Sequence, residues 1–233
     1  MLNSLKYGDS KVIVRLFGRQ TGSMSVVTSA QSSSRSRIKK QYFMPLSLIE
    51  VEVDFRQKNE LQKLRDVRLL APYSTIPFSP DKLAIALFCA EFLFHTLRSE
   101  ERNDALFEYI ADAMQWLDAS PANYANFHLT FLMRLSRFLG FFPNISEASE
   151  GAVFDLRAAS FSPQAPLHRD FLSASDSRAL LRLMQMDFRT MHLFSMSHHD
   201  RNRILEILLR YYTLHLPNFP ELRSVKVLQN LFD

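Results

Sequence analysis

Three acidic residues, Glu50, Glu52 and Asp54, alternate within the apolar segment 47–55. Residues two apart on a β-strand share a face, and three carboxylates on one face could hold Mg²⁺ as a nuclease does. The alternative is that the intervening apolar residues face a core and the acids face water. No partner carboxylate or histidine follows in a matching local motif, so we interpret the acids as the solvent side of a strand.

Other reactive side chains do not form a catalytic pattern. Cys89 stands among apolar residues, which predicts a buried, unreactive thiol. His198 and His199 are adjacent, so on a helix they point about 100° apart and make a poor chelating pair. One cysteine excludes an internal disulfide and a cysteine-rich zinc module. Neither GxGxxG nor GxxxxGK[ST] occurs, and we expect no enzyme activity, no metal and no cofactor.

The strongest chemical feature is a tract between Asp9 and Glu50 that contains no acidic residue. Its cations are Lys11, Arg15, Arg19, Arg35, Arg37, Lys39 and Lys40. Lysine and arginine attract phosphates, and a serine-rich segment such as SAQSSSRSRIKKQYFMP (29–45) can follow a variable backbone path. The alternative is a solvated loop. We favour a nucleic-acid-binding tract.

Aromatic residues accompany this tract. Tyr7, Tyr42 and Phe43 could supply faces on which bases stack. Aromatic residues in a small domain also fill the core, and for each one taken singly we favour core packing.

Charge is distributed unevenly along the 233 residues. Residues 1–75 contain 13 Lys and Arg against 6 Asp and Glu, whereas the remainder contains 15 against 18. This asymmetry predicts a basic module joined to a near-neutral one. The longest apolar run, 83–97, is too short to span a membrane. One cysteine and no visible signal peptide predict a reducing compartment, the cytoplasm.

The first 75 residues have the pattern of a small β-domain. Alternating or clustered apolar residues predict five strands, at 2–7, 11–17, 23–30, 47–55 and 60–70. Turn-forming residues separate the strands. Five short strands in about 70 residues predict a closed barrel of the OB type, a fold that binds oligonucleotides.

The remaining residues, 76–233, have helical periodicity. We predict helices at 82–98, 104–118, 122–139, 176–187, 188–195, 198–215 and 221–232. Residues 141–175 contain three prolines and predict an irregular insertion, with a short hairpin at 152–161. The fold class is therefore α+β, an OB-type barrel followed by an all-α domain.

Five stretches together resemble the bacterial RecO family of recombination mediators, most closely the version found in Bacteroidetes. They are LKYGDSKVIV (5–14), MPLSLIEVEV (44–53), APYSTIPFSPDKLAIALFCAEFLFHTLR (71–98), NFHLTFLMRLSRFLGFFPN (126–144) and DRNRILEILLRYYTLHLPNFPELRSVKVLQNLF (200–232). The resemblance spans the whole chain. It implies an OB domain that binds single- and double-stranded DNA and a helical C-terminal domain.

The resemblance also implies partners. Such proteins anneal complementary strands, bind the acidic tail of single-strand binding protein (SSB), and work with RecR to load RecA. Arg35, Arg37, Lys39 and Lys40 fall on the basic loop of the family. Many relatives carry a four-cysteine zinc site in the insertion, and most begin with a longer first strand. Residues 141–175 contain no cysteine, so we expect no zinc.

An acidic tail that ends in apolar residues needs cations beside an apolar groove. Arg134 and Arg137 lie one turn apart in a segment rich in Leu and Phe, and they could supply such a site. They could equally be ordinary surface arginines over a core helix. Three hypotheses for the whole chain remain: a DNA-binding annealing mediator, which we favour, an RNA-binding OB protein, and a protein-interaction scaffold.

Overall fold

The computed structural model describes residues 1–8, 11–29, 40–56 and 58–231. The chain forms two compact units: the first combines 1–119 with 222–228, and the second combines 120–221 with the residues from 229 onward. These units divide the chain elsewhere than the predicted domains, 1–75 and 76–233. The domain limits drawn from the sequence stay a prediction.

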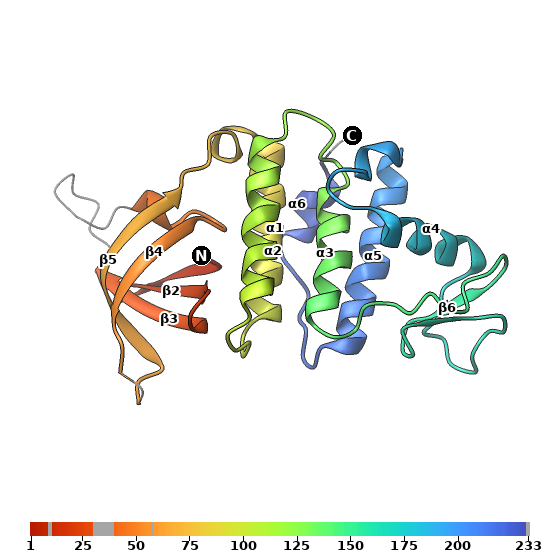
Figure 1. Cartoon of the computed structure of the whole chain (residues 1–233), viewed down its shortest axis with the longest axis horizontal. Helices are drawn as coiled ribbons and strands as arrows, with labels where there is room; N and C mark the ends of the chain where they lie inside the picture. Colours follow the sequence, from red (N-terminus) through yellow and green to blue (C-terminus); the bar gives the residue numbers. More distant parts are fainter. Residues whose placement is uncertain (9–10, 30–39, 57, 232–233) are drawn as a thin grey trace. The chain divides into compact units, whose positions relative to one another are not determined.

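A five-stranded sheet forms the N-terminal part of the first unit (Figure 1). Its strands are β1 (Asn3–Tyr7), β2 (Lys11–Gly18), β3 (Gly22–Ser29), β4 (Leu48–Asp54) and β5 (Leu61–Ala71), in the spatial order β1-β2-β3-β5-β4. All neighbours are antiparallel except β3 and β5, which are parallel. The five strands predicted from apolar alternation are confirmed, each to within two residues at either end.

One face of the sheet encloses a small core. Val14 and Val26 are fully buried, and Leu16, Leu64 and Val67 join them. Apolar residues of β4 pack against this cluster. Tyr42 and Phe43, both in the 3₁₀ turn η1 (Lys40–Phe43), pack against it as well. The alternation of β-strands therefore places every second side chain of β2 and β3 inside and the others outside.

Closure of the barrel is only partial among the described residues. No ladder joins β1 to β4, the two edges of the sheet. Two backbone hydrogen bonds bridge the gap: the Met1 amino group donates to the Ser47 carbonyl at 2.9 Å, and Leu46 N–H donates to the Met1 carbonyl at 2.9 Å. The OB-type order of strands is as expected, but full closure is not reached.

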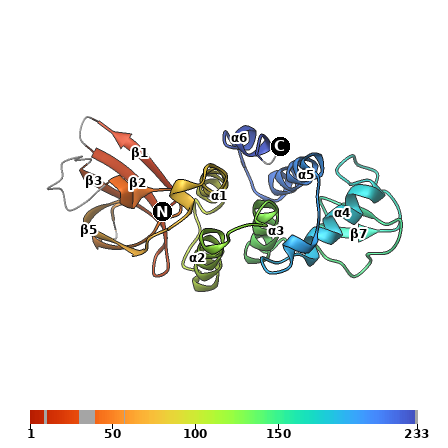
Figure 2. The same cartoon turned by 90° about the horizontal axis from the view of Figure 1, so that it is seen from above.

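Helices α1 (Pro80–Thr96) and α2 (Asp104–Ala119) run side by side in the first unit (Figures 1 and 2). Ser79 caps α1 by accepting a hydrogen bond from Lys82 N–H, and Pro80 occupies the first helical position, where no N–H is needed. The short helix α6 (Val225–Gln229) is held to α1, because the Glu91 carboxylate accepts hydrogen bonds from the backbone N–H groups of Arg223 and Ser224.

Asp118 ties the end of α2 to the segment that follows the sheet. Its carboxylate accepts hydrogen bonds from the backbone N–H groups of Ser74, Thr75 and Ile76, each at 2.8 Å. Lys82 Nζ donates to the Asp118 carbonyl at 3.0 Å. Burial alone would raise the pKa of Asp118, but the three backbone donors outweigh it and lower the pKa to about 2. This contact fixes the sheet to the helices of the same unit.

The second unit contains α3 (Phe127–Phe138), α4 (Ala174–Gln185) and α5 (His198–His215), together with the hairpin β6 (Val153–Asp155) and β7 (Ser160–Ser162). Helices α3 and α5 pack together, and Tyr212 Oη donates to the Leu132 carbonyl at 2.7 Å. The predicted hairpin within the insertion is confirmed. No helix within the described residues is both long and apolar enough to cross a membrane.

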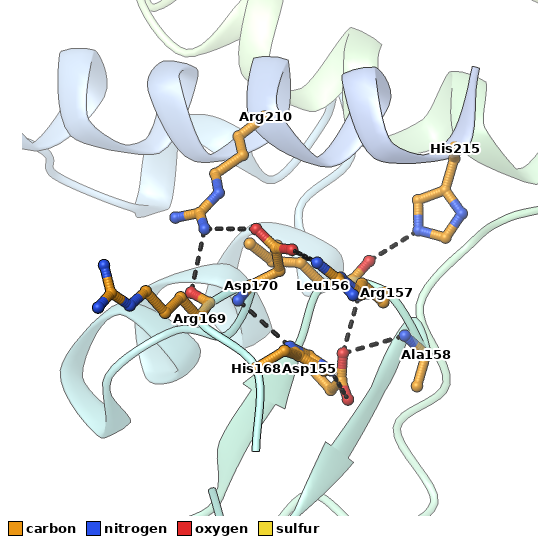
Figure 3. A network of polar contacts seen from close by, with 9 residues as sticks. All are labelled: Asp155, Leu156, Arg157, Ala158, His168, Arg169, Asp170, Arg210 and His215. Carbon is orange, nitrogen blue, oxygen red and sulfur yellow. Dashed lines mark hydrogen bonds and ion pairs between the residues drawn. The ribbon is translucent and has the colours of Figure 1, made fainter. Parts of the chain in front are cut away.

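A network of polar contacts holds the insertion against α5 (Figure 3). Asp170 accepts hydrogen bonds from Arg157 Nε and from Arg210 of α5, both at 2.6 Å. His215 Nε2 lies 2.8 Å from the Leu156 carbonyl. Asp155 accepts from the N–H groups of Arg157 and Ala158, which closes the turn between β6 and β7. The insertion is irregular apart from its hairpin, as predicted, and charge pairing and backbone hydrogen bonds fix it in place.

The helix predicted at 188–195 is wrong. Helix α4 ends at Gln185, and only the single 3₁₀ turn η3 (Met191–Leu193) follows before α5. The carboxylate of Asp187 accepts hydrogen bonds from the N–H groups of Arg189 and Thr190 at 2.8 Å, which gives the backbone a turn in place of a helix. The helix predicted at 122–139 begins only at Phe127, because Asn123 has a positive φ of 63°.

Candidate nucleic-acid interface

The side of the sheet that faces away from its core is the candidate site. On β2, Val14 and Leu16 point into the core. Because side chains alternate along a strand, Lys11, Ile13 and Arg15 lie on the opposite, outer side. The same strand therefore supplies both the packing of the unit and a set of outward cations.

The strand register adds residues from the neighbours of β2. Tyr7 is paired with Lys11, and Leu5 is paired with Ile13. Ile13 is paired in turn with Val27 of β3. We call six of the outward residues of these three strands the β1–β3 face: Leu5, Tyr7, Lys11, Ile13, Arg15 and Val27.

This face combines exposed apolar surface with positive charge. Leu5 is 65% exposed and Tyr7 is 54% exposed, whereas large apolar side chains usually avoid water. Lys11 is exposed beside them, and Arg15 is half-buried. The segments NSLKY, KVIVRLFG and GSMSVVTS of the three strands contain no acidic residue. An apolar face with cations and no acid suits a ligand that carries both flat apolar groups and negative charge.

The outer side of β4 and β5 has different chemistry. Its acids are Glu50, Glu52, Asp54 and Asp66, and its cations are Lys63, Arg65 and Arg68. We call these seven residues the β4–β5 face. Here two of the three cations are paired with acids: Arg68 Nε donates to Glu50 Oε2 at 2.5 Å, and Arg65 lies 2.5 Å from Asp54.

Those ion pairs explain the alternating carboxylates of β4. The hydrogen bond from Arg65 lowers the pKa of Asp54. The Asp54 carboxylate is therefore ionised and paired with the Arg65 guanidinium. Within the part of the chain that the structure describes, no group of three His, Cys, Asp or Glu side chains could hold a metal ion. The solvent-side interpretation of these acids agrees with the structure.

Arg19 does not lie with Lys11 and Arg15. It follows the far end of β2, roughly 25 Å from Lys11 at about 3.3 Å of rise per residue. There its guanidinium lies 5.1 Å from the ring centre of Phe107 and 3.7 Å from Glu108, both on α2. Next to it, Ser23 N–H donates to the Glu100 carbonyl at 2.9 Å. Arg19 therefore takes part in joining the β2–β3 turn to the helices.

The remaining predicted cations belong to the segment 35–40. Arg35, Arg37 and Lys39 lie outside the described residues. Lys40 begins η1, and only its backbone is described. Ser29, the last residue of β3, is paired with Lys11. The chain therefore enters the segment 30–39 at the Lys11 end of the β1–β3 face, the end opposite to Arg19.

The aromatic candidates separate into two kinds. Tyr42 and Phe43 pack against the core of the sheet, as core packing predicts. Tyr7 is exposed on the outer side. Sequence reasoning missed Leu5, Ile13 and Val27 as parts of the site. The alternation of side chains along β2 could have revealed them. If Val14 and Leu16 point inward, Ile13 must point outward, and so must the residues paired with it on β1 and β3.

The two arginines considered for tail binding differ in their surroundings. Arg134 Nε and Nη2 donate to the Met186 carbonyl at 2.9 and 2.7 Å, so Arg134 satisfies the carbonyl that ends α4. Arg137 is exposed, and its guanidinium lies 4.0 Å from the ring centre of Phe142. A separate pocket of about 780 Å³ lies between α4 and the start of α5 and includes Arg182 and Leu193.

Cys89 lies in the core, and the adjacent histidines His198 and His199 lie in the capped first turn of α5. Cys89 is fully buried in α1, and burial raises the pKa of its thiol. Ser197 caps α5, and Ser197 and Asp200 form a reciprocal capping box around His198 and His199. These positions fit packing and capping roles.

Two family models match this chain. The model described as recombination protein O, N-terminal, matches residues 1–73, and the model described as recombination protein O, C-terminal, matches residues 77–224. A DNA repair protein RecO from Phocaeicola vulgatus is 43% identical over 232 residues, which cover 100% of this chain and 96% of that protein.

Further relatives agree with this match. The DNA repair protein RecO of Bacteroides fragilis is 42% identical and covers 100% of this chain and 97% of its own length. That of Flavobacterium psychrophilum is 31% identical, over 100% of this chain and 96% of its own length. The resemblance to the Bacteroidetes version is confirmed, and the chain belongs to the recombination protein O (RecO) family of DNA repair proteins.

Proposed function

We propose that this chain binds DNA through the β1–β3 face and the cation-rich segment 35–40. Held in this way, single strands are annealed to their complements. The protein is a mediator and not an enzyme, and it acts on nucleoid DNA in the cytoplasm. With RecR, it helps to load RecA onto single strands covered by SSB.

The observation that carries this proposal is the chemistry of the β1–β3 face. Lys11 and Arg15 stand beside the exposed side chains of Leu5 and Tyr7, and these strands contain no acid that would repel phosphate. OB-type sheets bind oligonucleotides mainly across the surface of strands 2 and 3. The proposed face lies on those strands and their neighbour β1. The segment with four further cations continues from the same end of the face.

A comparison of ligands tests this function. The full chain is titrated with a labelled 30-nucleotide single-stranded DNA, with RNA of the same sequence, and with heparin as a non-nucleic polyanion. We expect DNA to bind at least as tightly as RNA and to be displaced by heparin only at a large excess of charge. The protein should also accelerate annealing of two complementary DNA strands.

Other outcomes would favour the rival hypotheses. Tighter binding of RNA than of DNA would support an RNA-binding OB protein. No binding of either nucleic acid at low salt, with the protein folded, would contradict the proposal and support an interaction scaffold.

We propose that the acidic tail of SSB binds the second unit, where exposed arginines lie near apolar side chains. Arg137 is the better candidate of the two predicted arginines, because Arg134 is engaged by the Met186 carbonyl. The pocket beside α4, which contains Arg182 and Leu193, is the rival location. Titration of a tail peptide against Arg137→Glu and Arg182→Glu separates the two: the site is where charge reversal weakens binding at least tenfold. Unchanged affinity in both variants would exclude both locations.

A further inference from the structure

The side chain of Tyr7 is an exposed aromatic ring on the outer side of the sheet. Tyr7 is the last residue of β1 and is 54% exposed, although a tyrosine ring stabilises a fold chiefly by being buried. The aromatic residues of the acid-free tract are covered. Tyr42 and Phe43 pack against the core. Phe17 is buried, with its ring centre 6.5 Å from that of Phe107. Tyr7 is therefore the aromatic ring that the β1–β3 face offers to a ligand.

The neighbours of Tyr7 define what that ligand would be. Lys11 is its partner across the strand pair, about 5 Å away between backbones. Leu5 lies on the same side of β1, about 7 Å along the strand. A ligand seated here meets a flat ring, an aliphatic surface and a cation within one or two strand spacings. A single-stranded nucleic acid has that chemistry, since each nucleotide carries an aromatic base and one phosphate.

We propose that Tyr7 is a specificity-determining residue that stacks on an unpaired base of single-stranded DNA, an inference that rests on the proposed function. Lys11 and Arg15 neutralise phosphates on either side of the stacked base, and Leu5 and Ile13 contact the adjacent sugar or base. A duplex keeps its bases stacked inside, so it can use the cations but not the ring. Tyr7 therefore favours single strands over duplex, and the cations alone do not.

Oligonucleotides that differ in bases but not in phosphates provide the test. The full chain is titrated with a dT₁₅ oligonucleotide and with an abasic oligonucleotide of the same number of phosphates. Base stacking on an aromatic side chain accounts for about 5- to 150-fold in affinity per base. We expect Tyr7→Ala to weaken dT₁₅ binding within that range, to change abasic binding less than twofold, and to leave the salt dependence unchanged. Tyr7→Phe, which keeps the ring, should restore dT₁₅ binding.

A matched control separates stacking from general loss of apolar surface. Phe78 is 83% exposed in the same unit but lies outside the β1–β3 face. Phe78→Ala should bind both oligonucleotides as the unaltered protein does. Melting curves of all variants should coincide, since neither ring is buried.

The outcomes distinguish this inference from the function on which it rests. If the unaltered protein binds neither oligonucleotide, the proposed function and the stacking role both fail. If it binds dT₁₅ and Tyr7→Ala binds equally well, only the stacking role fails. The exposed ring of Tyr7 would then be assigned to contact with a protein partner at the β1 edge of the sheet. Equal losses on dT₁₅ and on the abasic strand would also overturn stacking, because they would reflect a change in the face as a whole.

Discussion

The β1–β3 face and the β4–β5 face lie on the outer side of one sheet, yet they offer a ligand opposite conditions. On the β1–β3 face, Lys11 and Arg15 stand beside exposed apolar side chains with no acid on the same strands. On the β4–β5 face, Arg65 and Arg68 are paired with Asp54 and Glu50. Cations occur on both faces. Lys11 and Arg15 have no carboxylate on their own strands that competes with phosphate, whereas Arg65 and Arg68 reach phosphate only by leaving a carboxylate.

This difference shows why the net charge of a segment does not locate its binding surface. Residues 1–75 hold six acids, and four of them, Glu50, Glu52, Asp54 and Asp66, lie on β4 and β5. The excess of cations is therefore concentrated on the other strands and on the segment 30–40. Exposed ion pairs contribute little to stability, but they cancel the local field that would attract a polyanion.

The largest expected effect is on the free energy of unfolding, and it comes from Asp118, which belongs to neither face. Asp118→Ala removes the acceptor of three backbone N–H groups and leaves those donors beside a buried site. We expect a loss of about 3 kcal/mol in the free energy of unfolding, since hydrogen bonds to a charged group are worth about 1.5–3 kcal/mol each and partly relax on mutation. Chemical denaturation measures it. Asp112→Ala, an exposed acid on the same helix, should change stability by less than about 0.5 kcal/mol.

Because the pKa of Asp118 is lowered, we also expect the stability of the fold to depend on pH. The folded-state pKa of Asp118 is about 2, below that of an aspartate in an unfolded chain. Its contribution to stability is therefore complete above about pH 4 and is lost as the pH falls toward 2. Denaturation at pH 6 and pH 3 should show a smaller decrease in Asp118→Asn than in the unaltered protein. An equal decrease would contradict this assignment.

The cationic segment should have the next largest effect. If Arg35, Arg37, Lys39 and Lys40 each neutralise one phosphate of single-stranded DNA, each adds about 0.7 to the slope of log affinity against log salt. Replacing all four with alanine should lower the slope by up to roughly 3, with little dependence on DNA sequence. Titrations at four salt concentrations measure this, beside a melting curve that should not move. An unchanged slope would remove the segment from the interface.

A smaller effect, of opposite sign, is expected on the β4–β5 face. Glu50→Gln with Asp54→Asn removes the carboxylates that hold Arg68 and Arg65. The two guanidiniums can then attract phosphate, and the salt slope should rise by up to about 1.4. A decrease in DNA affinity would mean that these acids support the interface, contrary to the comparison of the two faces.

Much of the architecture could be predicted from the sequence, because it follows from local periodicity. Alternation fixed the five strands, and Ser79 with Pro80 marked the start of α1. The helix expected at 188–195 failed because the Asp187 side chain bonds to the backbone two and three residues later, and a hydrophobic pattern does not reveal that competition.

The candidate site was less predictable, because it depends on strand register. Lys11, Arg15 and Arg19 look equivalent in the sequence, but β2 places Arg19 at the opposite end beside Phe107 and Glu108. Leu5 and Val27 join the site only through pairing with β2. From the sequence, Arg134 looks like a surface cation. In the structure it donates a hydrogen bond to the backbone carbonyl of Met186, 52 residues away in the chain.

The most direct test of the account compares two matched double variants of the full chain, Lys11→Ala with Arg15→Ala and Arg65→Ala with Arg68→Ala. Each removes two cations from the outer side of the same sheet, so both lower the net charge equally. The salt slope for single-stranded DNA should fall by about 1.4 in the first variant and by less than about 0.5 in the second. Equal decreases in the two variants would show that net charge, and not the β1–β3 face, governs binding, and would contradict the account.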